Sequence, residues 1–249
     1  YDEAETWLES ALSIARDRGR AQSPLVARIL TSYCVLERLR NDYDAALDRL
    51  DQADAIYAVR LGAEHPDRLG LRIHRASVEK DAGRSEEAAS LLEGAVAAFR
   101  ARDEGASPAL ARALDELGAL RTREGDRARA REHLEEALAM REGLFGSEHP
   151  SIAETLESLA LLDARSGARD EALQRLDRAA EIVAATLGPD HPRRGVYRRH
   201  QGNIAYLEGR FAEALSHLEA ARGILEPQLG ESAAVARLYN SLGMVRLSL

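Results

Sequence analysis

Three histidines stand directly after a carboxylate and directly before a proline, and these residue types could do chemistry. They occur in the segments AEHP, SEHP and PDHP, as His65, His149 and His191 after Glu64, Glu148 and Asp190. A histidine beside a carboxylate is typical of a zinc ligand set and of a general acid–base pair. A metal centre and an acid–base site are therefore the two hypotheses to test first.

The residues at the equivalent positions of other segments indicate a structural role for these histidines instead. The equivalent positions in two other segments hold serine, Ser23 and Ser107, again before proline. Serine is a preferred N-cap because its oxygen accepts a backbone N–H of the first helical turn. Zinc ligands lie about 2 Å from the ion, whereas packed helices are about 10 Å apart, so successive histidines cannot share an ion. We predict that His65, His149 and His191 are N-caps, each with an acidic residue at the positive end of the helix dipole.

No other pattern in the sequence indicates catalysis. There is no glycine-rich phosphate loop, and HExxH, CxxC and GxSxG motifs are absent. The single cysteine, Cys34, excludes an internal disulfide framework, and we predict that it is a buried packing residue. We therefore expect a chain that is not an enzyme and that holds no metal and no cofactor.

Composition argues against several classes of partner. The net charge is −8, whereas nucleic-acid binding requires a basic surface. The sequence has no apolar run of membrane-spanning length and no signal-peptide pattern, so we expect no membrane partner and a cytoplasmic location. Lys80 is the only lysine among 34 basic residues, which favours a bacterial source rich in GC. The sequence starts at Tyr1 and not at methionine, so we expect a fragment of a longer protein.

A repeat of 42 residues runs through the sequence. Proline recurs at this spacing, as Pro24, Pro66, Pro108, Pro150 and Pro192. A turn residue follows at the same spacing, as Asn41, Gly83, Gly125, Gly167 and Gly209. The abundant residues are strong helix formers, and no segment of strand length alternates with period two. The sequence therefore predicts an all-α fold.

Each repeat carries the pattern of two helices. The first is expected to begin at the proline, which suits the first helical position, and to end before the turn residue, which favours a left-handed C-terminal conformation. The second helix follows, as in residues 169–188, where apolar residues recur at three and four. One position of the first helix always holds a small residue, namely Cys34, Ala76, Gly118, Ala160 and Gly202. Small side chains there predict a close approach of neighbouring helices.

The spacing of these small residues resembles the tetratricopeptide repeat (TPR). The small residue is followed by alanine after 12 residues, a large apolar residue after 16 and alanine after 19, as in Ala160, Ala172, Leu176 and Ala179. The usual TPR period is 34, and the longer period with a G-x-[DE]-H-P start resembles the kinesin-light-chain type. The resemblance implies a right-handed α-solenoid of stacked antiparallel helical hairpins.

Two sets of positions depart from the family pattern. The eleventh position of the first helix, which is usually aromatic, holds Glu37, Glu79, Arg121, Asp163 and Ala205. Two repeats place Arg72, Arg75, Arg198 and Gln201 where leucine is usual. We expect these repeats either to pack less tightly or to use the polar side chains elsewhere.

We divide the chain into a single TPR array. A leading second-type helix (1–22) precedes five hairpins (23–64, 65–106, 107–148, 149–190 and 191–231), and a trailing first-type helix (232–249) follows. Both terminal helices would expose a stacking face. We expect further repeats, another domain or a second copy of the chain to cover these faces.

The resemblance also implies a binding surface, because the first helices of TPR arrays line a concave groove. The candidate peptide-binding residues at groove-facing positions are Arg28, Arg38, Lys80, Arg112, Arg123, Arg165, Arg199, Asn203, Tyr206, Arg237 and Asn240. Over all groove-facing positions we count eight cations and four carboxylates, the latter Asp81, Asp115, Glu154 and Glu157. A groove more positive than the rest of the chain would attract an acidic segment.

We therefore expect a non-catalytic scaffold that binds a protein or peptide, with an acidic segment as the preferred partner. Two alternatives stay open. The chain resembles the regulatory or sensor arrays of bacterial signalling enzymes such as serine/threonine protein kinases, whose catalytic domain would lie outside this sequence. It could instead self-associate as a homo-oligomer through its terminal helices. Arg199 and Asn203 also resemble the first half of the carboxylate clamp of chaperone-binding TPRs, although the second half is missing.

Overall fold

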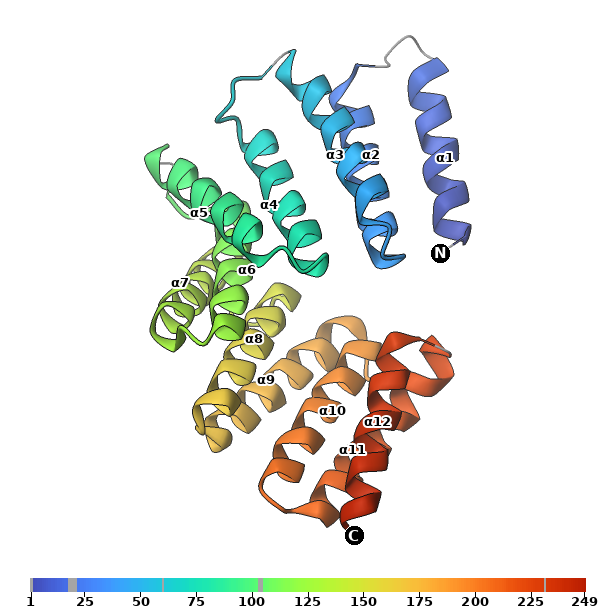
Figure 1. The fold of residues 1–249 in the computed structure, drawn as a ribbon, viewed down its shortest axis with the longest axis vertical. Coiled ribbons are helices and arrows are strands. Elements are labelled where there is room, and N and C mark those ends of the chain that lie inside the picture. The colour runs from blue at the N-terminus through green and yellow to red at the C-terminus, as the bar shows by residue number, and fades with distance from the viewer. Residues whose placement is uncertain (1, 18–21, 60, 103–104, 231) are drawn as a thin grey trace. The chain divides into compact units, whose positions relative to one another are not determined.

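A computed structural model describes residues 2–17, 22–59, 61–102, 105–230 and 232–249 (Figure 1). These residues form twelve α-helices and no strand, as the sequence predicts. The helices are α1 (Asp2–Asp17), α2 (Pro24–Leu39), α3 (Tyr43–Ala58), α4 (Pro66–Asp81), α5 (Ser85–Ala101), α6 (Pro108–Glu124), α7 (Arg127–Phe145), α8 (Pro150–Ser166), α9 (Arg169–Leu187), α10 (Pro192–Leu207), α11 (Phe211–Leu229) and α12 (Ala233–Ser248). Residues 18–21 of the expected leading segment and residue 231 at the expected end of the fifth hairpin lie outside the described residues.

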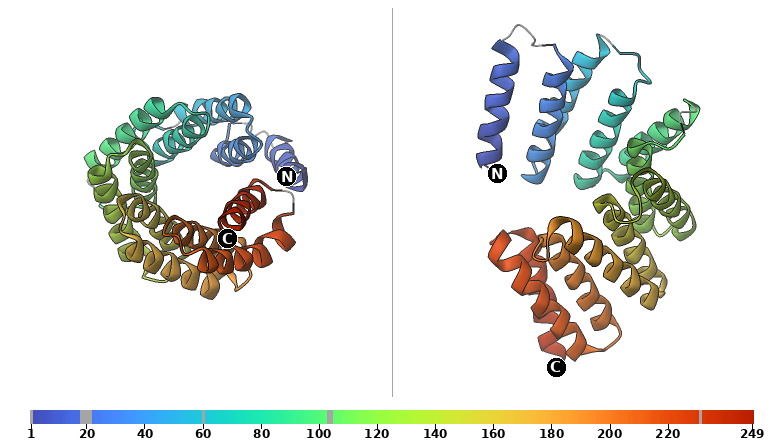
Figure 2. Two further views of the ribbon diagram at one scale, coloured as in Figure 1. Left: turned by 60° about the horizontal axis from the view of Figure 1, so that its bottom comes forward. Right: turned by 180° about the vertical axis from the view of Figure 1, so that it is seen from behind.

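The chain forms two compact units, Tyr1–Leu120 and Arg121–Leu249, and the boundary falls within α6. In the first unit α1 packs on α2, α2 on α3, α3 on α4 and α4 on α5. In the second unit the same order of neighbours runs from α7 to α12. First helices also touch each other directly, α2 against α4 and α10 against α12. Each unit is therefore a stack of antiparallel helical hairpins, which Figure 2 shows from two further directions.

Each of the five repeated prolines is the first residue of a helix, and the residue before it is the cap. The Nδ1 atoms of His65, His149 and His191 each accept the backbone N–H two residues further on, at 3.2 Å. The Oγ atoms of Ser23 and Ser107 accept an N–H three residues further on. The prediction that these histidines and serines are equivalent N-caps is confirmed.

The residues that end the first helices adopt the left-handed conformation that the sequence predicts. Gly83, Gly125, Gly167 and Gly209 have φ between 73° and 87°, and Asn41, at the same position of its repeat, has φ 62°. Asn41 is the only residue other than glycine with positive φ in the described part of the chain. Asparagine tolerates this conformation because its short polar side chain can bond locally, so the turn keeps its geometry where the glycine is absent.

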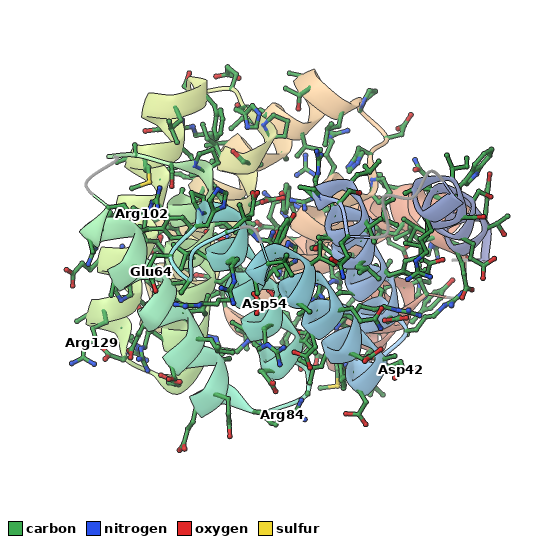
Figure 3. The ribbon with its side chains drawn as sticks, turned by 90° about the horizontal axis from the view of Figure 1, so that it is seen from above. Asp42, Asp54, Glu64, Arg84, Arg102 and Arg129 are labelled. Atoms are coloured by element: carbon green, nitrogen blue, oxygen red, sulfur yellow. The ribbon has the colours of Figure 1, made fainter. Side chains whose placement is uncertain are left out.

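Side chains outside the core tie the hairpins together at their ends. The guanidinium of Arg102, at the end of α5, donates to the carbonyl oxygen of Glu64 at 2.8 Å, and both residues are labelled in Figure 3. Asp42 caps α3 by accepting the N–H of Ala45 at 3.1 Å. Arg129 in α7 instead points away from the helices into solvent. The contacts of Asp42 and Arg102 fix the loops that precede α3 and α4.

The core of each hairpin is built from the repeated small and apolar residues. The alanines and leucine at the TPR positions of α9, Ala172, Leu176 and Ala179, are fully buried. Cys34 is also fully buried at the small-residue position of α2, as predicted, and burial raises the pKa of its thiol to about 11. Trp7, in contrast, lies on α1 with a side chain that is 69% exposed.

Gly202 marks a close approach of two helices in the second unit. A Cβ atom added there would lie 2.7 Å from the Leu218 Cγ and 3.2 Å from the carbonyl oxygen of Ala214. Both atoms belong to α11, the second helix of the same hairpin. The glycine therefore sets the distance between α10 and α11, and an alanine cannot enter without displacing α11 or its leucine.

We expect the Gly202→Ala variant to lose about 1–3 kcal/mol of unfolding free energy, because overpacking outweighs the gain in helix propensity. Gly223→Ala is the matched control, since a Cβ atom added to this α11 residue meets nothing within 4 Å. The control is expected to gain about 0.5–1 kcal/mol. Urea unfolding measures both, and a change of the same sign in the two variants would contradict this account.

Ion pairs replace the usual aromatic residue at the eleventh position of three first helices. Glu37 accepts from Arg49 at 3.0 Å, and Glu79 pairs with Arg84. Asp163, whose side chain is 2% exposed, is held by two guanidiniums, from Arg131 at 2.6 Å and Arg175 at 2.7 Å. Each of these acidic residues therefore occupies a packing position together with an arginine partner that offsets its charge.

The polar residues at the leucine positions make a second recurring contact. Arg75 pairs with Asp51, and the amide of Gln201 donates to Asp177 at 2.7 Å. Asp51 and Asp177 lie at the same position of second helices three repeats apart. Each contact joins a first helix to the second helix of the preceding hairpin. These two repeats thus replace an apolar contact between hairpins by a polar one.

We expect the Asp163→Ala variant to lose about 2–3 kcal/mol, because two guanidiniums lose their charged acceptor. Glu181→Ala, at an exposed position of α9, is the control and is expected to change stability by no more than about 0.5 kcal/mol. Urea midpoints compare the two. A loss in Asp163→Ala as small as that of the control would show that the buried ion pairs contribute nothing net.

Candidate peptide-binding surface

The candidate residues lie on the first helices, and we call the side of each unit formed by these helices its first-helix side. In the first unit this side comprises α2, α4 and the part of α6 up to Leu120, and in the second unit α8, α10 and α12 with the end of α6. The two units are described separately. Their charges are arranged differently, although the sequence count assigns four cations to each.

In the first unit most of the predicted cations already have partners. Arg38 pairs with Asp81, and Lys80 pairs with Glu116. Glu116 also accepts the hydroxyl of Ser77 at 3.0 Å. Burial acts to raise the pKa of Glu116, but Lys80 foremost, with Arg112 and Ser77, outweighs it and holds the pKa below its ordinary value. The carboxylate is therefore ionised and neutralises this part of the surface.

Arg112 lies against the ring of His74, with guanidinium nitrogens 3.3 and 3.5 Å from the two ring nitrogens. Burial foremost, together with the charge of Arg112, lowers the pKa of His74 to about 4 against the opposing effect of Glu116. The imidazole is consequently neutral at pH 7. A protonated ring would place a second cation against Arg112 inside the stack of helices.

The depressed pKa of His74 makes stability depend on pH. An unfolded histidine has a pKa near 6.5, so between about pH 6.5 and pH 4 the unfolded chain binds the proton more readily than the folded chain. The unfolding free energy therefore falls as pH drops through this interval. We expect His74→Gln to flatten this dependence, measured as urea midpoints at several pH values. An unchanged slope would contradict the assignment.

In the second unit the predicted cations lack acidic partners. Arg123 and Arg237 make no ion pair with any residue that the structure describes, and both are exposed. Arg165 donates only to the carbonyl oxygen of Thr122, at 3.4 Å. The two acidic residues expected on this side are engaged elsewhere: Glu154 pairs with Arg193 at 2.7 Å and Glu157 with His200 at 3.2 Å.

Arg199 is the most constrained of these arginines. Its Nε atom is buried and without a hydrogen-bond partner in the described residues, and one terminal nitrogen lies 3.4 Å from the ring of His200. Burial lowers its pKa, and the charge of Arg237 on the adjacent α12 lowers it further, while Glu157 acts in the opposite direction. Two cations of neighbouring first helices thus act on each other with no carboxylate bound to either.

The remaining candidates are three residues of the second unit and Arg28 of the first. Asn203, one turn after Arg199, is half-buried, and its side-chain amide makes no hydrogen bond with a described residue. Tyr206 packs its ring against Phe211, with centroids 5.7 Å apart, which favours a packing role. Asn240 on α12 is exposed. Arg28, in the first unit, is also exposed and lines a cavity between α2 and α4.

One class of residue on this side was missed from the sequence. Ser32, His74, Glu116, Ser158 and His200 share a repeat position one residue after an expected groove position. Their contacts with Lys80, Arg112 and Glu157 place three of them on the first-helix side. Helical spacing could have identified them, because this position is four residues after one expected groove position and three before another. Glu116 adds a carboxylate that the sequence count omitted.

Neither a metal-binding group nor a membrane-spanning helix is found among the described residues. No group of three or more His, Cys, Asp or Glu side chains among them could hold a metal. None of the helices in the described part of the chain is both long and apolar enough to cross a bilayer.

Comparison with known proteins identifies the class of protein. The family model of the tetratricopeptide repeat matches residues 67–143, 110–185 and 151–226. These segments cover more than half of the chain, so the chain belongs to the tetratricopeptide repeat family. Proteins of this fold are generally non-catalytic scaffolds for protein–protein interaction. No curated protein sequence matches the chain.

Solved structures place the chain beside kinesin-light-chain-like repeat proteins. It is 27% identical to a Podosopora anserina kinesin light chain protein of nearly identical TPR-like repeats, with a TM-score of 0.62 over 84% of this chain and 99% of that one. BtubC (BKLC) from P. vanneervenii is 20% identical, with a TM-score of 0.69 over 93% and 91% of the two chains. A Rap protein complexed with Competence and Sporulation Factor is 14% identical, with a TM-score of 0.68 over 90% and 65%. The last two similarities concern the fold alone.

Proposed function

We propose that this chain is a non-catalytic scaffold that binds an acidic segment of a protein partner on the first-helix side of its second unit. The observation that carries the proposal is the set of four arginines there, Arg123, Arg165, Arg199 and Arg237. None of the four has a carboxylate within ion-pair distance among the described residues, whereas Arg38 and Lys80 in the first unit are paired.

Arg199 and Arg237 form the centre of the proposed binding surface. Burial of Arg199 beside a second cation costs free energy that a bound carboxylate would offset, since opposite charges at close range favour the charged form of both. A guanidinium can hold a carboxylate with two parallel hydrogen bonds. Arg199 is the better anchor of the two, because its partial burial leaves less water to compete for the ligand.

Asn203 completes a simple recognition element. Its amide lies on the same helix face as Arg199, four residues further on, and can both donate to and accept from a peptide backbone. An extended segment with an acidic side chain on Arg199 would thus bring its backbone to Asn203. Similarity of fold to the Rap protein, which was solved with Competence and Sporulation Factor, is compatible with this use of the surface.

The test uses a fluorescein-labelled peptide of alternating glutamate and leucine and a lysine–leucine peptide of the same length. We expect the acidic peptide to bind, more weakly as salt rises, and the basic peptide not to bind. The Arg199→Gln/Arg237→Gln variant is expected to weaken binding of the acidic peptide at least about tenfold, measured by fluorescence anisotropy.

A matched control separates this site from general charge attraction. Arg127→Gln/Arg129→Gln removes the same charge from exposed positions at the start of α7 and is expected to leave affinity within about twofold. Equal losses in the two double variants would mean that net charge alone drives binding. Full affinity in Arg199→Gln/Arg237→Gln would overturn the proposed site.

A further inference from the structure

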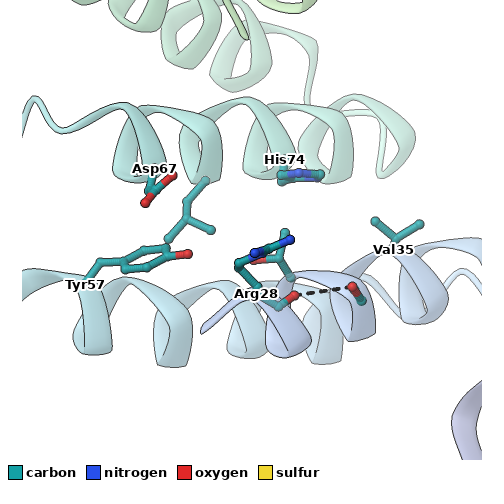
Figure 4. A pocket seen from close by; sticks show the side chains of 8 residues that line it. Arg28, Val35, Tyr57, Asp67 and His74 are labelled. Atoms are coloured by element: carbon teal, nitrogen blue, oxygen red, sulfur yellow. Dashed lines mark hydrogen bonds between the residues drawn. The ribbon is translucent and has the colours of Figure 1, made fainter. Parts of the chain in front are cut away.

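A cavity of about 280 Å³ lies in the first unit between α2, α3 and α4, well separated in sequence from the arginines of the second unit. Figure 4 shows its lining residues, among them Arg28 and Val35 from α2, Tyr57 from α3, and Asp67, Leu71 and His74 from α4. Its volume is close to the lower limit of small-molecule sites in proteins. It can hold one ligand of about amino-acid size.

Two opposite charges line this cavity without pairing. Arg28 has no ion pair with any described residue, and in Figure 4 it lies apart from Asp67, near His74. Among the described residues, the ion-pair partner nearest to Asp67 is the ring of His65, at 3.8 Å, and the Nδ1 atom of that ring accepts the Asp67 backbone N–H. The Nδ1 atom that accepts this hydrogen bond has no N–H to donate to the Asp67 carboxylate. Both charges are thus available to a ligand.

The Tyr57 hydroxyl lies between the two charges. The tyrosine is 4% exposed, and its hydroxyl points along the cavity toward Arg28 in Figure 4. Burial raises the pKa of Tyr57, Asp67 raises it further and Arg28 lowers it. A hydroxyl under both influences can donate to an anion or accept from a cation, so it can bond either end of a ligand that spans the cavity.

The rest of the lining is apolar or uncharged. Val35 and Leu71 contribute aliphatic surface, and His74 is neutral at pH 7. Gly70, which stands one repeat after Arg28, brings no side chain, and a Cβ atom added there would meet nothing within 4 Å.

We infer that this cavity binds a small zwitterion, namely a free amino acid with an aliphatic side chain. The ligand carboxylate would pair with Arg28, its ammonium group with Asp67, and its side chain would contact Val35 and Leu71. A ligand with a carboxylate alone would leave Asp67 without a counter-ion, and one with an ammonium group alone would leave Arg28 without one. The charge that either competitor leaves unpaired is what selects a zwitterion.

The test compares L-leucine with two blocked derivatives by isothermal titration calorimetry and saturation-transfer NMR. Leucinamide lacks the carboxylate and N-acetylleucine lacks the ammonium group. We expect leucine to bind at least about tenfold more tightly than either derivative. Absence of saturable leucine binding at millimolar concentrations, or equal binding of N-acetylleucine, would overturn the inference.

Two variants assign the ends of the ligand. Arg28→Gln is expected to reduce the affinity for leucine to that for leucinamide and to leave leucinamide unaffected. Asp67→Asn is expected to reduce it to that for N-acetylleucine. Retained discrimination against leucinamide in Arg28→Gln would show that Arg28 does not bind the carboxylate. Unchanged thermal unfolding confirms that both variants fold.

The same variants keep this inference separate from the proposed scaffold function. Arg28→Gln and Asp67→Asn are expected to bind the glutamate–leucine peptide as the unaltered chain does, and Arg199→Gln/Arg237→Gln is expected to bind leucine normally. Leucine binding lost in Arg199→Gln/Arg237→Gln would place the amino acid in the second unit and refute the cavity as its site.

Discussion

The distance between the first and second helix of a hairpin is the constraint on which the structure depends. Gly202 lies so close to Leu218 that no Cβ atom fits, and the equivalent cysteine, alanines and glycine in the other repeats are buried in the same way. Small residues allow the helix axes to approach to the near limit of packing. Once this distance is fixed, the leucines and alanines of the second helix fill the remaining space at every repeat, and the loops need only reverse the chain.

Within that fixed packing, the protein uses ion pairs where related repeats use aromatic or aliphatic side chains. Asp163 holds Arg131 and Arg175 at an almost fully buried position, and Arg75 and Gln201 reach acidic residues of the preceding hairpin. Such pairs contribute less than well-packed apolar groups, but removal of one partner is costly. These pairs therefore make the stacking of hairpins specific. A shifted register is disfavoured because each polar group would then lose its partner.

The two units differ in which of their cations are held in ion pairs. On the first-helix side of the first unit, Glu116 and Asp81 take up the charges of Lys80 and Arg38. The arginines of the second unit have no such acids, because Glu154 and Glu157 are held by Arg193 and His200. A chain with a net charge of −8 can thus present cations to a partner on one surface, since local pairing and not total charge decides what remains free.

The sequence by itself determined the helices, their caps and their turns, and the TPR fold. These depend on local chemistry: proline starts a helix, Ser23 or His149 caps it, and Asn41 or glycine ends it, whatever lies further along the chain. The candidate surface was predicted only as a set of positions. Which arginines are free was decided by tertiary structure, because Glu116 meets Lys80 from the next first helix, 36 residues away. The cavity beside Arg28 is likewise a tertiary feature, since three helices line it, and no local pattern fixes the distance between Arg28 and Asp67.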